Sequence, residues 1–193
     1  MNRQQKRMMM FMLPLVVFVL LMIMLFFRLG KPTDVVIDTS VHHPLPTFSL
    51  PLLSEPNRLM TNADLPKQAF LLNVWGSWCP TCKIEHPFLL KLQADGVPMV
   101  GVNYKDELPN ALGYLNDYKN PFLFSVQDLD GKYAIELGLT GAPETFVVDG
   151  QGVVYKHILG EIGEQNWANI KTCMMAIDNP TLDEKAKLGA CDD

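Results

Sequence analysis

Residues 69–82 read AFLLNVWGSWCPTC, and this stretch decides the fold that we predict. The run Phe70–Trp75 is short and apolar, which is typical of a buried β-strand. Pro80 suits the first turn of a helix, because the N–H group that proline lacks needs no partner there. The stretch therefore predicts a strand that leads into a helix, with Cys79 and Cys82 at the junction.

The two cysteines form a dithiol that can close into a disulfide and reopen. Residues i and i+3 in the first turn of a helix meet the Cα separation of about 4.4–6.8 Å that a disulfide requires. A helix N-terminus favours an anion, so we expect a lowered thiol pKa at Cys79. Cys79 is then the attacking thiolate, Cys82 resolves the mixed disulfide with a partner, and Trp78 shields the site from water.

Three other uses of a C-x-x-C pair compete with this interpretation. Haem attachment of the C-x-x-C-H type fails because residue 83 is Lys83. Zinc needs two further ligands, and although His86 follows one turn after Cys82, the sequence has no second C-x-x-C. A permanent structural disulfide stays open as an alternative, although an exposed turn beside a tryptophan is an unusual place for one.

Further elements are expected on both sides of this stretch. An edge strand or extended segment over 45–53 and a turn at 55–57 precede it, and a helix follows it up to residues 95–96. We then expect strands at 97–104, 122–126 (a candidate edge strand), 144–149 and 153–159, and helices at 110–119, 132–137 and 164–177. This order predicts a mixed α/β sheet with helices on both faces.

Two residues before the strand at 144–149 are of interest. The sequence Gly-Ala-Pro makes the Ala142–Pro143 bond a candidate cis peptide. A cis bond would place the backbone of Ala142 beside the dithiol, where it could pair with an extended substrate. An ordinary trans turn is the alternative.

Three polar residues could influence the dithiol. Glu85 follows Cys82 by three residues, so its carboxylate could oppose thiolate formation and exchange a proton. A solvated glutamate on the helix surface is the alternative. Glu144 is either an acidic lip of the substrate groove or a charge at a strand edge. Asn73 is polar within an apolar strand and is a candidate for a buried group under the site.

Cys173 and Cys191 are 18 residues apart and lie in no motif that suggests catalysis. If they pair, they staple the C-terminal tail to the last predicted helix. They could equally be unpaired, since the tail from Asp178 onward has the composition of a loosely ordered segment.

The N-terminal stretch Met8–Phe27 is 20 residues long and carries no charge. A helix of that length covers roughly 30 Å, the thickness of a bilayer's hydrocarbon core. A cleaved signal peptide is an alternative, but its apolar region is usually about 7–15 residues and ends at small residues. Basic residues are more frequent before the stretch than after it: Arg3, Lys6 and Arg7 against Arg28 and Lys31. This asymmetry predicts an uncleaved anchor with its N-terminus in the cytoplasm and an exported domain.

The exported part is acidic. Five of the 16 basic residues precede residue 32, so the remaining 11 face all 21 acidic residues, a net charge of −10. This charge argues against nucleic acid or anionic lipid as a partner. An even number of cysteines in an exported domain permits disulfides.

A Trp-Cys-x-x-Cys after a strand, with a proline before a later strand, resembles the thioredoxin family over roughly residues 45–178. Three stretches narrow this resemblance: NVWGSWCPTCKIEHP (73–87), VGVNYKD (100–106) and GAPETFVVDGQG (141–152). They resemble the membrane-anchored thiol:disulfide interchange proteins of cytochrome c biogenesis, the CcmG/DsbE type. The resemblance implies an α/β fold with a thioredoxin-like mixed sheet flanked by helices, and one N-terminal transmembrane helix.

The resemblance also implies a function. Proteins of this type are reductants at the bacterial inner membrane, with the C-terminal domain in the periplasm. They reduce a disulfide of apocytochrome c, or of a maturation component that holds it, and a DsbD-like transmembrane dithiol carrier returns the electrons. No cofactor and no metal are expected, because the redox-active disulfide Cys79–Cys82 carries the chemistry.

Carried onto this sequence, the resemblance assigns Cys79 as the nucleophile, Cys82 as the resolving thiol, Glu85 as the acidic residue beside them, and Pro143 as the cis-proline. Many thioredoxins have a buried aspartate at the position of Asn73, so this departure shifts a proton-relay role to Glu85. The residues expected to contact the partner are Trp78, Pro80, Thr81, Ala142, Pro143 and Glu144.

The residues also indicate the direction of electron flow. The dipeptide between the cysteines, Pro80-Thr81, contains no cationic histidine, and Glu85 and Glu144 add negative charge. Both features disfavour a very stable thiolate at Cys79, so we expect only a moderately lowered pKa and a reducing potential.

Two other functions remain as alternatives: a general periplasmic disulfide oxidase or isomerase, and a non-catalytic thioredoxin-like binding module.

The chain is expected to divide into five segments. It comprises a cytoplasmic N-terminus (1–7), a transmembrane anchor (8–27), a tether (28–44), a thioredoxin-like periplasmic domain (45–178) and a C-terminal tail (179–193).

Overall fold

The computed structural model describes residues 12–24 and 42–192. Residues 12–24 are helical. Among the described residues, no helix has both the length and the apolar character needed to cross a membrane. The predicted anchor, residues 8–27, extends beyond the described residues 12–24 on both sides. Its ends lie outside the described residues, as do residues 1–7, most of the predicted tether, and residue 193.

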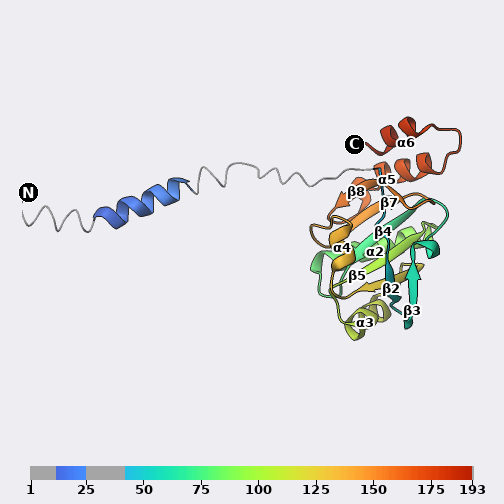
Figure 1. Cartoon of the computed structure of the whole chain (residues 1–193), viewed down its shortest axis with the longest axis horizontal. Coiled ribbons are helices and arrows are strands. Elements are labelled where there is room, and N and C mark those ends of the chain that lie inside the picture. The colour runs from blue at the N-terminus through green and yellow to red at the C-terminus, as the bar shows by residue number, and fades with distance from the viewer. Residues whose placement is uncertain (1–11, 25–41, 193) are drawn as a thin grey trace, which may run out of the picture. The chain divides into compact units, whose positions relative to one another are not determined.

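The domain is built on one eight-stranded sheet with the order β1-β8-β7-β4-β5-β6-β2-β3 (Figure 1). The central strand β4 pairs in parallel with β5 and antiparallel with β7. The sheet is therefore mixed, as the sequence predicts. The strands are β1 (His43–Pro44), β2 (Ser49–Leu52), β3 (Glu55–Thr61), β4 (Phe70–Trp75), β5 (Met99–Tyr104), β6 (Phe124–Asp128), β7 (Glu144–Val148) and β8 (Val153–Leu159).

Helices cover both faces of this sheet. The helical segments of the domain are η1 (Asn62–Asp64), α2 (Pro80–Ala94), α3 (Leu108–Tyr118), α4 (Lys132–Glu136), α5 (Glu164–Ile177) and α6 (Glu184–Cys191). One core cluster joins α2, α3 and α5 to one face of the sheet, and a second joins α4 to the other face. The chain thus has the thioredoxin-like mixed α/β architecture.

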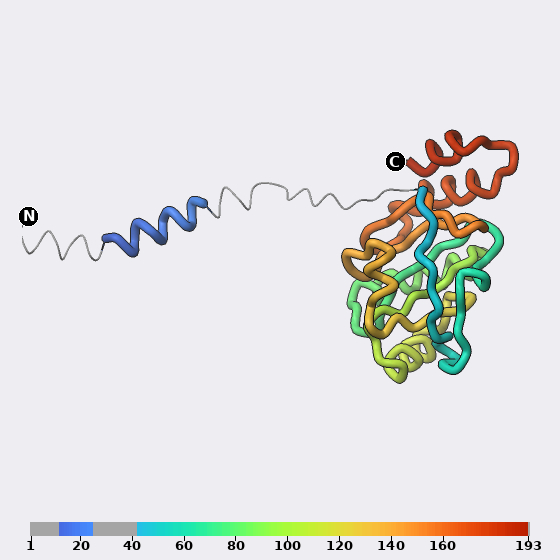
Figure 2. The backbone as a smooth tube through the Cα atoms, in the orientation of Figure 1, coloured from blue at the N-terminus to red at the C-terminus, as the bar shows by residue number. Residues whose placement is uncertain are grey.

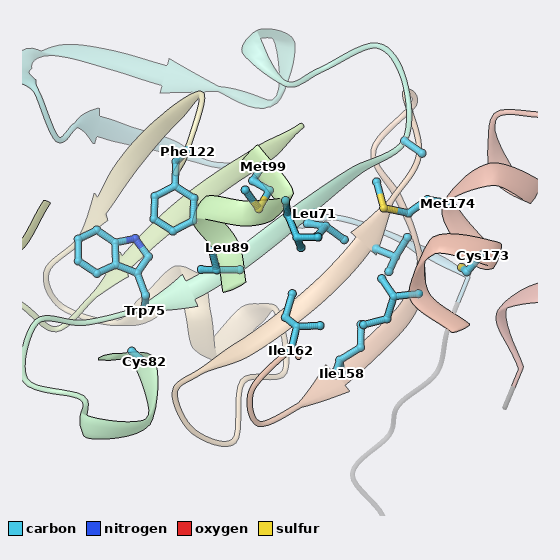
Figure 3. Packing of buried hydrophobic residues seen from close by; sticks show 14 of the residues in the cluster. Leu71, Trp75, Cys82, Leu89, Met99, Phe122, Ile158, Ile162, Cys173 and Met174 are labelled. Carbon is cyan, nitrogen blue, oxygen red and sulfur yellow. The ribbon is translucent and has the colours of Figure 1, made fainter. Parts of the chain in front are cut away.

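Strand β4 shows how the sequence produces these two cores. Its six residues are all buried, and successive side chains point to opposite faces. Leu71 and Trp75 belong to the cluster under α2, where Leu71 lies near Leu89 and Met99 (Figure 3). The alternate residues Phe70, Leu72 and Val74 belong to the other cluster. Asn73 shares the parity of Leu71 and Trp75, so it lies on the α2 side of the sheet.

Two details near β2 differ from the prediction. The predicted turn at 55–57 is wrong: β3 begins at Glu55, and the chain reverses at residues 53–54. Pro56 is tolerated in this strand because β3 is the last strand of the sheet. The predicted edge strand at 122–126 is also misplaced, since β6 lies inside the sheet between β5 and β2. Neither fact is visible locally, because each depends on which strand pairs with which.

The ends of the domain are more ordered than predicted. Strand β1, within the predicted tether, pairs with β8, and the N–H of His42 donates to the carbonyl of Val154 at 2.6 Å. The predicted loose tail contains α6, which follows α5 along the chain (Figure 2). Cys173 and Cys191 are joined in a disulfide, with their Cα atoms 4.5 Å apart, which ties α6 to α5.

Candidate active site

The two cysteines of the C-x-x-C motif lie where β4 gives way to α2. Cys79 is the N-cap residue of α2 and Pro80 is its first residue. The structure holds Cys79 and Cys82 as a disulfide, with their Cα atoms 5.3 Å apart. The N–H of Cys82 donates to the sulfur of Cys79 at 3.1 Å. A helix N–H that donates to this sulfur favours negative charge on it once the disulfide is opened.

The disulfide is nearly covered, whereas its neighbours are exposed. Cys79 and Cys82 are 2% and 3% exposed, but Trp78 is 51% exposed. The indole N–H of Trp78 donates to the carbonyl of Tyr104 at 3.1 Å, which fixes the ring beside the site. Gly76 permits this position, because a Cβ there would lie 2.5 Å from the indole nitrogen. Pro80 is exposed and Thr81 half-buried, so both lie at the surface beside the disulfide.

The loop before β7 brings Ala142 and Pro143 to the same place. The register of the sheet pairs Val74, next to the end of β4, with Glu144, the first residue of β7. The Ala142–Pro143 peptide bond is cis, the conformation that the resemblance implies. The carbonyl oxygen of Ala142 lies 3.3 Å from the sulfur of Cys79. The structure therefore brings the dithiol and the predicted docking loop together.

Glu85 is buried rather than solvated, so the interpretation as a surface glutamate is wrong. The residue is 2% exposed and lies one turn beyond Cys82 on α2. Its carboxylate accepts hydrogen bonds from the N–H of Ile162 at 2.7 Å and from the amide of Asn73 at 3.2 Å. Burial raises the pKa of Glu85 to about 7, and these two hydrogen bonds offset only part of the rise. A group with this pKa can take or give a proton near neutral pH.

Asn73 is the buried polar residue under the site. It is fully buried, and its Nδ2 donates to Glu85 and, at 2.9 Å, to the hydroxyl of Thr145. Its Oδ1 is buried and has no hydrogen-bond partner within the described structure. An ionised Glu85 requires a donor from Asn73, whereas a protonated one could donate to Oδ1 after the amide turns over. The amide can therefore match either protonation state of Glu85.

Asp106 fixes the backbone ahead of Cys79, a role that we did not predict from the sequence. Asp106 is 3% exposed, and its carboxylate accepts the N–H of Ser77 at 2.6 Å and the hydroxyl of Ser77 at 2.8 Å. It also accepts the amide of Asn103 at 3.0 Å. The available signal was its place just after a buried parallel strand, at the edge of the sheet where the cysteine motif also lies.

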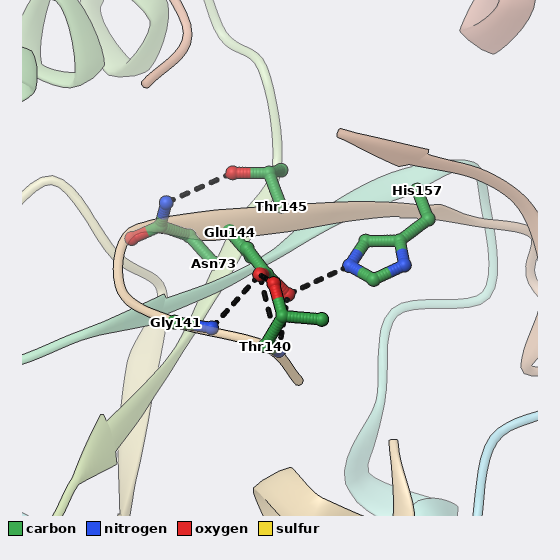
Figure 4. Close-up of polar contacts among 6 residues, drawn as sticks. All are labelled: Asn73, Thr140, Gly141, Glu144, Thr145 and His157. Carbon is green, nitrogen blue, oxygen red and sulfur yellow. Dashed lines mark hydrogen bonds and ion pairs between the residues drawn. The ribbon is translucent and has the colours of Figure 1, made fainter. Parts of the chain in front are cut away.

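Glu144 also lies inside the protein, so both of its predicted surface roles are wrong. It is 2% exposed, and its carboxylate points back at the loop that precedes it (Figure 4). The carboxylate accepts hydrogen bonds from the N–H and hydroxyl of Thr140 and from the N–H of Gly141. Nε2 of His157 lies 2.8 Å from its Oε2. Burial raises the pKa of Glu144, but the contacts with His157 and Thr140 outweigh it, and the net pKa is lowered.

His86 has a structural place. Its Nε2 lies 2.9 Å from the carbonyl oxygen of Lys119 and 3.2 Å from that of Tyr118, at the end of α3. Burial lowers the pKa of His86 despite these two contacts. Within residues 12–24 and 42–192, no group of three or more His, Cys, Asp or Glu residues is arranged to hold a metal ion.

Comparison with known proteins agrees with this geometry. The Redoxin family model matches residues 40–172. The thiol:disulfide interchange protein DsbE of Pseudomonas aeruginosa is 40% identical over 155 residues, covering 80% of this chain and 86% of that protein. The DsbE protein of Allochromatium vinosum is 40% identical over 169 residues, covering 87% of this chain and 92% of that protein.

Solved structures show the same fold. A secreted thiol-disulfide isomerase from Corynebacterium glutamicum has a TM-score of 0.60 and 26% identity, covering 72% of this chain and 87% of that one. The dsbF protein of MTB has a TM-score of 0.58 and 27% identity, covering 66% of this chain and 94% of that one. With a C-x-x-C disulfide at a helix N-terminus beside a proline loop, the chain belongs to the Redoxin family, among the DsbE-type thiol:disulfide interchange proteins, and is a protein-disulfide oxidoreductase.

Proposed function

We propose that this protein is a reductant of disulfides in apocytochrome c, or in a maturation component that holds it, during the maturation of c-type cytochromes. The observation that carries the reducing direction is the pair of buried carboxylates at the site. Glu85 lies one turn after Cys82, and Asp106 binds Ser77, two residues before Cys79. Negative charge nearby disfavours a thiolate, which destabilises the reduced form and makes the dithiol a better electron donor.

The exchange consumes the dithiol form of the protein and produces the disulfide form seen here. The thiolate of Cys79 attacks one sulfur of the partner's disulfide, and the partner's other sulfur leaves as a thiolate. Cys82 then gives up its proton, and its thiolate attacks the sulfur of Cys79. This second step closes the Cys79–Cys82 bond and releases the partner's first sulfur, so that two electrons pass to the partner.

Glu85 accepts and returns the proton that moves in this scheme. With a pKa raised to about 7, it can accept the proton of Cys82 when the mixed disulfide is resolved. It can return that proton to the departing thiolate. Asn73 supports both states, because its amide offers a donor in one orientation and an acceptor in the other.

The partner chain docks on the exposed rim of the site. The half-buried backbone of Ala142, before Pro143, offers hydrogen-bonding groups to an extended segment. Trp78, Pro80 and Thr81 supply the neighbouring side-chain surface. Glu144 takes no direct part in this contact, because its carboxylate is turned inward onto Thr140 and Gly141.

We also propose where the protein is located and what kind of protein returns electrons to it. The uncharged stretch 8–27 and its flanking basic residues support a single-pass anchor in the bacterial inner membrane, with the domain in the periplasm. A DsbD-like transmembrane dithiol carrier would return the disulfide to the dithiol state. The redox-active pair needs no further cofactor for this chemistry, and the charge of −10 on residues 32–193 speaks against nucleic acid as a partner.

The experiment that tests this function is a trap. In a Cys82→Ser variant of the full chain, the mixed disulfide at Cys79 cannot be resolved, so partners stay attached and can be identified by mass spectrometry. We expect apocytochrome c or a maturation component, and the Cys79→Ser variant should capture nothing. A broad set of periplasmic proteins would instead indicate an oxidase or isomerase. Absence of any partner, with cytochrome maturation intact in both variants, would indicate a binding module.

A further inference from the structure

The loop that leads to Pro143 is held from inside by one carboxylate. Glu144 accepts the N–H of Gly141 at 2.9 Å and the N–H of Thr140 at 3.1 Å, and it also accepts the hydroxyl of Thr140. These donors belong to exposed residues, but the carboxylate that collects them is 2% exposed. The loop backbone is therefore anchored immediately before Ala142, the residue beside the sulfur of Cys79.

His157 holds this carboxylate from the opposite side. It lies on β8, opposite Phe146 of β7, and its ring stacks on that of Phe146 with centroids 4.1 Å apart. Its side chain is 6% exposed, and its Nε2 lies 2.8 Å from Oε2 of Glu144 (Figure 4). An ionised carboxylate only accepts hydrogen bonds, so Nε2 carries a hydrogen and donates. The stacking on Phe146 fixes the direction of this donor.

We propose that His157 is a positioning residue for thiol–disulfide exchange: acting through Glu144, it fixes the loop of Thr140, Gly141 and Ala142 on which a partner's backbone docks. Without this donor, the buried carboxylate of Glu144 would have too few hydrogen bonds. Its hydrogen bonds to the loop would then change. His157 touches neither the dithiol nor the partner in this scheme. It governs how well a peptide disulfide is presented to Cys79.

His157 is placed to influence the docking of a partner without influencing the reaction at the sulfur atoms. The sulfur of Cys79 has its own donor in Cys82, and Glu85 has its own in Ile162 and Asn73. Loss of the His157 donor should therefore slow exchange with a partner that pairs with the loop. It should leave the reduction potential and the reactivity toward a small disulfide unchanged. The inference rests on exchange at Cys79, not on the cellular direction or the partner proposed above.

The test uses the full chain in detergent micelles and two probes. One is a peptide that contains an oxidised C-x-x-C-H pair, and the other is hydroxyethyl disulfide, which has no backbone to dock. For His157→Phe, which keeps an aromatic ring on Phe146 but removes the donor, we expect kcat/KM for the peptide to fall about tenfold, the scale of one lost charge-assisted hydrogen bond. The fall should lie in KM, and the rate with hydroxyethyl disulfide and the potential should stay at the wild-type values.

Further variants make the result specific. His157→Gln retains an N–H donor and should recover most of the peptide rate. Thr140→Val removes one loop donor at an exposed position and tests the same contact even if a variant at 157 fails to fold. In a Glu144→Gln background, His157→Phe should add little, because the two residues act as one unit. His86→Gln is the matched control, since it alters another buried histidine at the end of α3 and should change neither probe.

The inference is overturned by either of two outcomes. Folded His157→Phe and Thr140→Val could exchange with the peptide at the wild-type rate, or both probes could slow equally with a shifted potential. The second outcome would place His157 in the general support of the dithiol. Failure of the reductant proposal would appear differently, as a wild-type potential near that of a strong oxidant, and would leave the comparison of the two probes interpretable.

Discussion

The sulfur of Cys79 and the carbonyl oxygen of Ala142 lie 3.3 Å apart, although 63 residues separate them in the chain. The contact follows from the pairing of β4 with β7, which sets Val74 opposite Glu144. A partner that pairs its backbone with Ala142 therefore has its own chain within reach of the nucleophile. The sheet itself, not the flexibility of a loop, places Ala142 beside the sulfur of Cys79.

The first prediction concerns the reduction potential. Titration of the full chain against glutathione should give a potential well on the reducing side of the roughly −120 mV of a strong periplasmic oxidant. The physical reason is that Asp106, and Glu85 when it is ionised, place negative charge near the cysteines. A measured value close to −120 mV would contradict the reductant role.

The second prediction concerns the contribution of Glu85 to pH-dependent stability. Its pKa rises from 4.5 to about 7 on folding, so between these values the folded state binds more protons than the unfolded state. Stability from this group is thus present below pH 4.5 and is lost as pH rises to about 7. Relative to Glu85→Gln, the wild type should lose up to about 3 kcal/mol of unfolding free energy over this range.

Denaturant unfolding at a series of pH values measures this difference. Glu136→Gln, on the exposed side of α4, is the matched control and should run parallel to the wild type. Parallel curves for Glu85→Gln and the wild type would show that Glu85 titrates normally. The rate of mixed-disulfide resolution should also lose its inflection near pH 7 in Glu85→Gln, because Gln cannot accept the proton of Cys82.

The third prediction concerns Asp106. Asp106→Asn removes a buried negative charge that binds Ser77, two residues before the nucleophile Cys79, and weakens the hold on Ser77. A thiolate at Cys79 becomes more stable, so the potential should become more oxidising by on the order of 30 mV, a tenfold change in the equilibrium constant. Asp95→Asn, at the opposite end of α2, should leave the potential unchanged. An unchanged potential in folded Asp106→Asn would remove Asp106 from this role.

The fourth prediction concerns the second disulfide. Replacing both Cys173 and Cys191 by alanine frees α6 from α5 and should lower the unfolding free energy by about 3 kcal/mol, the usual effect of opening a loop of this size. Thermal or denaturant unfolding measures the loss. The rate of exchange at Cys79 should stay the same under native conditions. Equal stability of variant and wild type, or a parallel loss of exchange, would contradict a purely structural disulfide.

The junction of β4 and α2 could be predicted because its signals are local. An apolar run, a proline suited to a first helical turn and the cysteine spacing lie within 14 residues, and β4 has the predicted bounds Phe70–Trp75. The surroundings of Glu85 could not be predicted, because its donor Ile162 lies 77 residues away. The same holds for Glu144, which turns inward only because His157 and the loop supply four polar contacts.

The ends of the domain were missed for a related reason. Strand β1 has only two residues and exists through its pairing with Val153 and Val154. Helix α6 has only eight residues, and its place depends on the Cys173–Cys191 bond and on the hydrogen bond from Tyr155 to Glu184. Periodicity alone does not predict elements that owe their order to distant partners.

Strand β8 receives both ends of the domain. His43 and Pro44 pair with it, Tyr155 binds Glu184, and the amine of Lys156 donates to the carbonyl of Cys191. Tension applied to the chain ahead of residue 42 would load this strand and the staple on α6 before it reached β4. The rate of exchange at Cys79 should therefore be the same when the chain ahead of residue 42 is under tension and when that part of the chain is removed.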